Sequence, residues 1–174
     1  LMAVLIIDLA FVIIKGPPLI YGVSAFVLTS LLVVYGIIHA FNVKSRNFEV
    51  SLTGLKKDFR IVHLSDVHIG HFRGVKFLDK IINLSLSQDP DAIFITGDLF
   101  DGRIQLSEEV LEPLKKVKVP IYFVEGNHDR YTGVSTIKEY LRNKNVQVLE
   151  NEVAMLGELQ IVGLNHMRAD GNTR

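Results

Sequence analysis

Residues 19–41 form an unbroken run of uncharged and mostly apolar positions, LIYGVSAFVLTSLLVVYGIIHAF. A helix rises about 1.5 Å per residue, so this run would span roughly 34 Å and can cross a hydrocarbon core about 30 Å thick. The run therefore predicts a transmembrane helix. Gly16-Pro17-Pro18 interrupts the pattern on its amino-terminal side, and residues 1–14 form a second apolar stretch. We expect a membrane anchor of one helix or a helical hairpin over residues 1–45.

The remaining chain, residues 46–174, alternates between two kinds of apolar pattern. Short apolar runs predict strands, and apolar residues at helical spacing separate them. The predicted strands are 48–52, 60–65, 91–96, 119–125, 146–149, 152–156 and 159–164, and the predicted helices are 75–86, 105–116 and 135–143. Strands that are apolar throughout and separated by helices are typical of an α/β fold whose parallel or mixed sheet is covered on both faces.

Charge divides the chain at the same place. The sequence has 19 Lys plus Arg and 19 Asp plus Glu, and only Asp8 and Lys15 precede residue 42. A signal peptide would need a basic n-region, which is not seen, and so long an uncharged helix rarely forms the core of a small domain. Lysines and arginines follow the apolar run closely, so the positive-inside rule predicts that residues 46–174 lie on the cytoplasmic side.

Composition narrows the chemistry of the second part. No strongly basic region is present, which argues against nucleic acid as the main partner, because phosphate neutralisation needs clustered Lys and Arg. The sequence has no cysteine, which excludes disulfides, thiolate nucleophiles and Cys-based metal sites. A bound metal would have to be held by His, Asp, Glu or Asn.

Three predicted strands end in residues of these metal-binding types. Ligands of α/β sheets collect beyond the carboxyl ends of the strands, so the three ends should meet. Each motif alone has a plainer explanation, such as a helix cap or a turn. Their joint occurrence at one sheet edge favours a shared site. The motifs are Asp66 and His68 in 61-IVHLSDVHIG-70, Asp98 in 93-IFITGDLFDG-102, and Asn127, His128 and Asp129 in 124-VEGNHD-129.

Two of these motifs carry a local expectation about geometry. Asp66 and His68 are two positions apart, so in an extended backbone their side chains leave on the same side and can reach one cation. Gly97 removes side-chain bulk beside Asp98 and lets the backbone approach a ligand closely.

In order and interval, Asp66-x-His68, Gly97-Asp98 and Gly126-Asn127-His128-Asp129 resemble the first three blocks of the calcineurin-like metallophosphoesterase family. The resemblance runs from about residue 60 to about residue 164. The segments NVQVLENEVAML and ELQIVGL resemble the portion that follows the third block in the membrane-associated or exported bacterial and archaeal branch of the family. It implies a βαβαβ core, as the first part of a β-sandwich flanked by helices.

The resemblance also implies a role for each residue and a reaction. Two divalent cations, Mn, Fe, Zn or Co, would lie about 3.5–4 Å apart and activate a water molecule for hydrolysis of a phosphomonoester or phosphodiester. His128 would stabilise charge on the phosphoryl oxygen or donate a proton to the leaving group, and Asp129 would orient the His128 ring. Asp66 and His68 would hold the first metal, Asp98 would bridge both, and Asn127 would bind the second.

The chain departs from the family pattern at its carboxyl end. The family has further histidines downstream, and His166 does not stand in a matching block. We therefore expect residues 46–174 to be the amino-terminal part of the catalytic domain, within a chain truncated at its carboxyl end. His63 is expected to be a packed strand residue, and His71 lies close enough to the motifs to contact substrate.

Two classes of function remain open at this point. The first is a membrane-anchored phosphoesterase whose phosphorylated substrate can be lipid-linked, a nucleotide, a phosphoprotein or a cell-wall phosphate. The second is a non-catalytic metal-binding scaffold or sensor in the membrane. The complete Asn127-His128-Asp129 run favours the enzyme, because a scaffold does not need a positioned proton donor.

We predict that residues 1–174 alone do not hydrolyse bis-p-nitrophenyl phosphate efficiently with manganese, because the second cation would lack most of its ligands. The measurement is release of p-nitrophenol. Robust turnover that Asp98→Ala abolishes would contradict the prediction.

Overall fold

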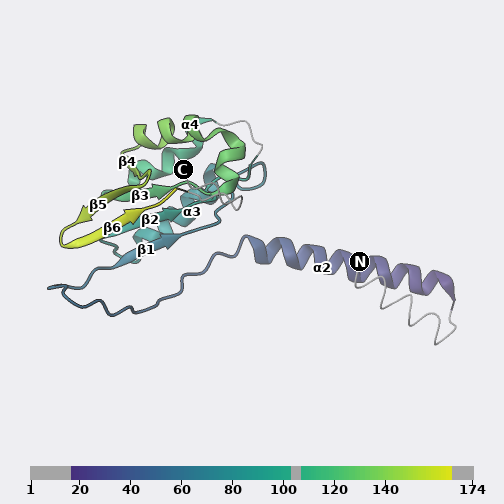
Figure 1. The fold of residues 1–174 in the computed structure, drawn as a ribbon. Helices are drawn as coiled ribbons and strands as arrows, with labels where there is room; N and C mark the ends of the chain where they lie inside the picture. The colour runs from purple at the N-terminus through teal and green to yellow at the C-terminus, as the bar shows by residue number, and fades with distance from the viewer. Residues whose placement is uncertain (1–16, 103–106, 166–174) are drawn as a thin grey trace, which may run out of the picture. The chain divides into compact units, whose positions relative to one another are not determined.

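The computed structural model describes residues 17–102 and 107–165 (Figure 1). The chain divides into two units between Arg46 and Asn47. The first unit contains helix α2 (Pro18–Ala40), and the second contains the predicted α/β fold.

Helix α2 has no buried residue, and its apolar side chains are exposed on all sides. It is 23 residues long and, among the described residues, it is the one helix long and apolar enough to cross a membrane. A helix that is apolar all round needs an apolar environment, either lipid or a protein core. The predicted run 19–41 corresponds to this helix within one residue at each end, and the second apolar stretch at residues 1–14 lies outside the described residues.

A four-stranded parallel sheet forms the centre of the second unit. Its spatial order is β1-β2-β3-β4, with every neighbouring pair parallel. The register aligns Val62, Ile93 and Ile121 across three strands, so the carboxyl ends of these strands lie at one edge. The strands are β1 (Ile61–Leu64), β2 (Ala92–Thr96), β3 (Ile121–Val124) and β4 (Val146–Val148).

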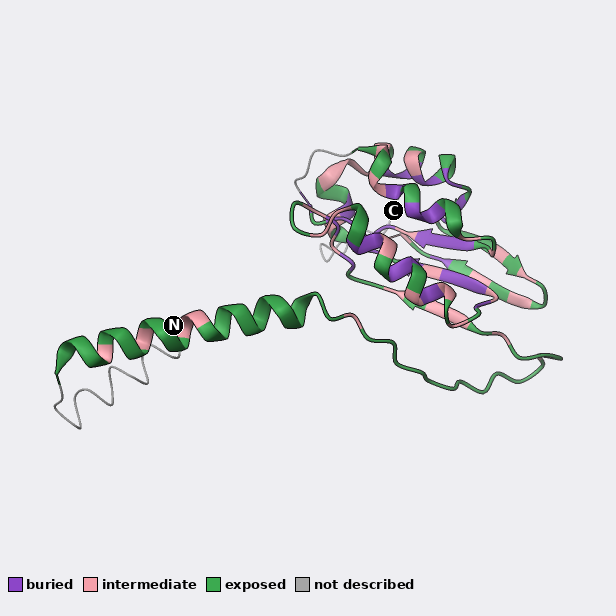
Figure 2. Cartoon of the chain, turned by 180° about the vertical axis from the view of Figure 1, so that it is seen from behind, coloured by how far each residue is buried: buried purple, intermediate pink, exposed green. Residues whose placement is uncertain are grey.

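The two faces of this sheet have different covers. On one face Ala92, Tyr122 and Leu149 form a core with residues of an antiparallel hairpin, β5 (Glu152–Leu156) and β6 (Leu159–Gly163). Successive strand residues point to opposite faces, so Ile93, Ile95 and Phe123 face the other side. The cover there is α3 (Val75–Leu86), η1 (Glu108–Lys116) and α4 (Asn127–Asn143), each of which buries apolar residues. Figure 2 shows these buried positions along the strands and on the inner sides of the helices. The predicted α/β class is confirmed.

Three elements differ from their predicted form. Residues 48–52 form no strand, and Phe48 is 82% exposed, because the period-two pattern needs a partner strand that the described chain does not supply. Of the predicted helix 105–116, residues 105 and 106 lie outside the described residues, and 108–116 form a 3₁₀ helix that contains Pro113, which has no backbone N–H for a helical hydrogen bond. Helix α4 begins at Asn127 instead of Ser135 and is kinked at Gly133, whose φ of 111° suits glycine.

His63 also differs from its prediction as a packed residue. Its side chain is exposed on β1, and its Nε2 lies 2.5 Å from Oγ1 of Thr96 on the neighbouring strand. The period-two alternation directs it to the sheet face whose hairpin cover does not reach that position.

Phe123→Ala is expected to lower the free energy of unfolding by about 3–5 kcal/mol, because Phe123 is fully buried in the central strand pair and its loss leaves a cavity. Phe72→Ala is the matched control, since Phe72 is 91% exposed and its loss should change stability by less than about 0.5 kcal/mol. Urea unfolding of both variants measures the difference. Equal effects would contradict the assignment of the core.

Candidate metal centre

The loops after β1 and β2 run side by side at the carboxyl edge of the sheet. The His68 amide donates to the Asp98 carbonyl at 3.0 Å, and the Ile69 amide donates to the Leu99 carbonyl at 2.8 Å. An isolated parallel bridge joins Ile69 to Phe100. The two sequence motifs are therefore held together by backbone hydrogen bonds.

Asp66, His68 and Asp98 all have left-handed backbone conformations, with φ of 55°, 51° and 52°. The prediction of an extended backbone at Asp66 and His68 is therefore wrong. The side chains nevertheless meet, since His68 Nε2 lies 3.9 Å from Asp66 Oδ1. Each of the three offers one ligand atom in a group whose members lie within 4.8 Å of one another. Non-glycine residues adopt positive φ rarely, and such strain gathers at functional sites.

Strand β3 brings the third motif against Asp98. A Cβ on Gly126 would lie 2.1 Å from Asp98 Oδ1, so only glycine allows the approach. The His128 amide donates to the same oxygen at 2.9 Å. Asn127 stands between these two contacts, exposed at the first position of α4. Its backbone is thus fixed beside Asp98, and its ligation of a metal stays a prediction.

The His128 ring lies beside the other predicted ligands. Its centroid is 4.7 Å from that of His68, with the two rings nearly perpendicular. The ring of Tyr131, which is largely exposed, lies edge-on to the His128 ring, with 6.4 Å between the two centroids. The His128 side chain is partly exposed, so it is accessible to a substrate from outside.

Asp129 has partners other than the predicted one. It is fully buried, and its two oxygens accept hydrogen bonds from the Phe100 amide at 3.0 Å and the Gly126 amide at 2.9 Å. Burial raises the pKa of the Asp129 carboxyl, although the backbone hydrogen bonds act in the opposite direction. These two hydrogen bonds tie the start of α4 to the loop after β2, and the role of Asp129 in orienting the His128 ring stays a prediction. An acid three residues after the N-cap is a common helix-start signal, and it was present in the sequence.

Asp101 is the residue that the sequence reasoning missed. Its Oδ1 lies 3.5 Å from His68 Nδ1, and it forms a second compact group of possible ligand atoms with His68 and His128. The available signal was its position three residues after Asp98 in the same loop.

His71 is exposed in a turn of the loop after β1, which the Gly70 amide closes by donating to the Arg73 carbonyl at 3.0 Å.

The residues at this edge fit a divalent cation. His68 Nδ1 is buried, and Asp101 Oδ1, at 3.5 Å, is too far away to form an ordinary hydrogen bond with it, so among the described residues the atom has no hydrogen-bond partner. A buried polar atom without a partner is costly, which suggests that the site is completed by a ligand. Carboxylate oxygens with imidazole nitrogens are the donor set that Mn, Fe, Zn and Co accept.

Comparison with known proteins gives one family. The model of the calcineurin-like phosphoesterase family matches residues 59–168. An uncharacterized metallophosphoesterase of Campylobacter jejuni is 31% identical over 153 residues, covering 86% of this chain and 41% of the relative. A Danio rerio protein named "Transmembrane protein with metallophosphoesterase domain" is 33% identical over 143 residues, covering 76% of this chain and 32% of the relative.

A third relative is named as a phosphodiesterase. Phosphodiesterase YaeI of Escherichia coli is 31% identical over 122 residues, covering 64% of this chain and 45% of the relative. The chain thus spans less than half the length of each of these curated relatives.

Gly126→Ala is expected to reduce manganese affinity by at least about 10-fold, because the new Cβ would displace Asp98 and the His128 amide that binds it. The control is Gly74→Ala at the N-cap of α3, where an added Cβ meets nothing within 4 Å. Isothermal titration of the metal-free proteins with Mn²⁺ measures both. Unchanged affinity in Gly126→Ala would show that this contact does not shape the centre.

Proposed function

The chain belongs to the calcineurin-like phosphoesterase family, and we propose that the protein is a membrane-anchored phosphohydrolase that uses two divalent cations. The observation that carries this proposal is the compact group formed by Asp66, His68 and Asp98. All three have left-handed backbones, which the fold maintains against their intrinsic preference. The relatives named metallophosphoesterase support the same reaction class.

Each side chain has a proposed part in holding the cations. Asp66 and His68 would hold the first cation, and the Asp98 carboxylate, one oxygen of which accepts from the His128 amide, would serve both cations. Asn127, exposed beside Asp98, offers its side-chain carbonyl to the second. When bound, two such cations supply an activated water molecule and offset the negative charge of the phosphoryl group.

His128 and Asp101 have proposed parts toward the substrate. The partly exposed His128 ring can bind a phosphoryl oxygen or deliver a proton to the departing oxygen. Asp101 Oδ1 lies 3.5 Å from His68 Nδ1, and a slight approach would let it accept a hydrogen bond from that nitrogen and fix the orientation of the ring. Asp129 keeps the start of α4 in place through two backbone amides, so that His128 stays next to His68.

Membrane attachment is the second half of the proposal. Helix α2 is uncharged and has no buried residue, and a relative of this chain is named as a transmembrane protein. The basic residues Lys44 and Arg46 follow the helix directly and favour a catalytic unit on the cytoplasmic side. An enzyme held at a bilayer meets lipid-linked phosphates by proximity, so these are the proposed substrates. The relative named as a phosphodiesterase supports a diester as the first compound to test.

Asp98→Asn in the full-length protein is expected to lower manganese-dependent hydrolysis of bis-p-nitrophenyl phosphate by at least about 100-fold, because the neutral amide cannot replace a carboxylate between two cations. Asp89→Asn is the matched control. Asp89 shares the left-handed φ of Asp98, 50° against 52°, but it is exposed in the turn after α3, whereas Asp98 is partly buried.

Initial rates with the diester and with p-nitrophenyl phosphate measure this prediction and show which ester class is preferred. A wild-type protein without metal-dependent turnover, or an Asp98→Asn variant as active as Asp89→Asn, would contradict the proposed function.

A further inference from the structure

Glu125 is a buried acid directly between strand β3 and the motif that begins α4. Its side chain is 2% exposed, although it stands only two positions before Asn127. Glutamate is almost never fully buried unless it is paired, because removing its charge from water is costly. The position therefore requires an explanation that the predicted metal ligands do not give.

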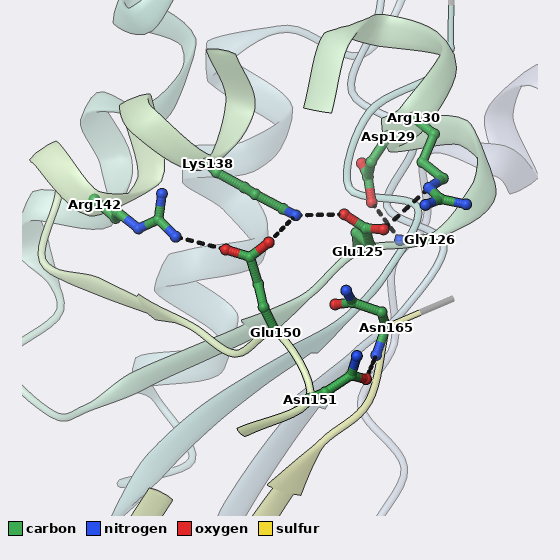
Figure 3. Close-up of polar contacts among 9 residues, drawn as sticks. All are labelled: Glu125, Gly126, Asp129, Arg130, Lys138, Arg142, Glu150, Asn151 and Asn165. Atoms are coloured by element: carbon green, nitrogen blue, oxygen red, sulfur yellow. Dashed lines mark hydrogen bonds and ion pairs between the residues drawn. The ribbon is translucent and has the colours of Figure 1, made fainter. Parts of the chain in front are cut away.

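The two oxygens of Glu125 bind two different basic residues of α4 (Figure 3). Its Oε1 lies 3.0 Å from Arg130 Nε, and its Oε2 lies 2.6 Å from Lys138 Nζ. We call these three residues the Glu125 clasp. Burial acts to lower the pKa of Lys138, but hydrogen bonds to Glu125 and Glu150 outweigh it and raise the pKa above its usual value. Lys138 is thus a cation, and its pair with Glu125 lies in the interior, whereas Arg130 binds Glu125 from an exposed position.

The clasp spans a break in the helix. Gly133 has φ 111° and ψ 76°, so α4 consists of two helical segments that meet at a kink. Arg130 belongs to the segment that carries Asn127 and His128, and Lys138 belongs to the segment that packs on the sheet through Ile137 and Leu141. Because Gly133 leaves the helical conformation, the two segments do not form one straight helix. Glu125 binds a side chain of each segment and therefore connects the two segments across the kink.

Stability alone does not account for such an arrangement. Buried ion pairs contribute little net stability compared with well-packed apolar side chains of similar size, because desolvation offsets their attraction. Such pairs do fix the relative position of the two side chains, since the charged atoms of both partners must meet. Only Gly126 separates Glu125 from Asn127, and that glycine lies against Asp98. A shift of Glu125 would therefore reach the predicted ligands directly.

We propose that Glu125 is a positioning residue that fixes the first segment of α4, and with it Asn127 and His128, relative to Asp98. This inference rests on the proposed function, because it assigns Glu125 a part in forming the second cation site. Glu125 acts through Arg130 and Lys138 and does not itself touch metal or substrate. Nothing in the motif Gly126-Asn127-His128-Asp129 requires an acid at the preceding position.

The test compares Glu125→Gln with Glu150→Gln in the full-length protein. Glu150 is the matched control because it also binds Lys138, at 2.6 Å, and Arg142, at 2.8 Å, yet it forms no ion pair with the first segment among the described residues. Mn²⁺ affinity and stoichiometry are measured on the metal-free proteins by titration calorimetry, thermal unfolding reports stability, and bis-p-nitrophenyl phosphate reports kcat and KM.

Glu125→Gln should weaken the weaker-bound Mn²⁺ by about 10-fold or more and lower kcat with little change in KM. Glu150→Gln should keep wild-type Mn²⁺ affinity within about 2-fold, even where both variants lose similar thermal stability. If Glu125→Gln does not fold, Arg130→Gln, at an exposed position, should show the same loss, with Arg142→Gln as its control.

Two results would overturn the inference while the proposed function stands: wild-type Mn²⁺ affinity in Glu125→Gln, or an equal loss in Glu150→Gln. A wild-type protein that binds no Mn²⁺ and hydrolyses no ester would instead refute the proposed function, and the positioning role would fall with it.

Discussion

Strands β2 and β3 end with their backbones in direct contact, and this contact is possible only because glycines occupy it. A Cβ on Gly97 would lie 2.8 Å from Gly126 Cα, and one on Gly126 would lie 2.1 Å from Asp98 Oδ1. The close approach lets the His128 amide reach the Asp98 carboxylate and lets Asp129 bind the Phe100 and Gly126 amides. The geometry of the candidate centre is therefore a consequence of backbone proximity before any metal is considered.

The same edge of the sheet holds strained backbone that the rest of the fold must stabilise. Positive φ at Asp66, His68 and Asp98 costs on the order of 1 kcal/mol or more at each residue. Backbone hydrogen bonds between the two loops and a fully buried layer beneath them, including Ile69, Leu99 and Phe100, hold these conformations. The strain directs the side chains of separate strands toward a common point, as a preformed binding site requires.

How far the sequence predicted the structure depends on how local each signal was. Helix 75–86 was predicted with its observed bounds, because its apolar spacing alone defines the buried face. The strand at 48–52 was wrong, since a strand also needs a neighbour, which its own residues do not encode. The left-handed conformations of Asp66 and His68 depend on the adjacent loop and could not be read from their spacing.

Within the candidate site the same distinction applies. The residue types pointed to the group formed by Asp66, His68 and Asp98, whereas the partners of Asp129 and the place of Asp101 depend on how the loop after β2 folds back. The Glu125 clasp could not be predicted from the sequence for a further reason. Its partners are five and thirteen positions away along the chain, and a kink at Gly133 separates them.

Electron paramagnetic resonance of the manganese-loaded full-length protein tests the central claim most directly. If side chains from separate strand ends share one pair of cations, the spectrum should show two exchange-coupled Mn²⁺ ions per chain, at the separation of about 3.5–4 Å typical of two-metal sites. A spectrum of a single isolated ion, or of none, would contradict the account.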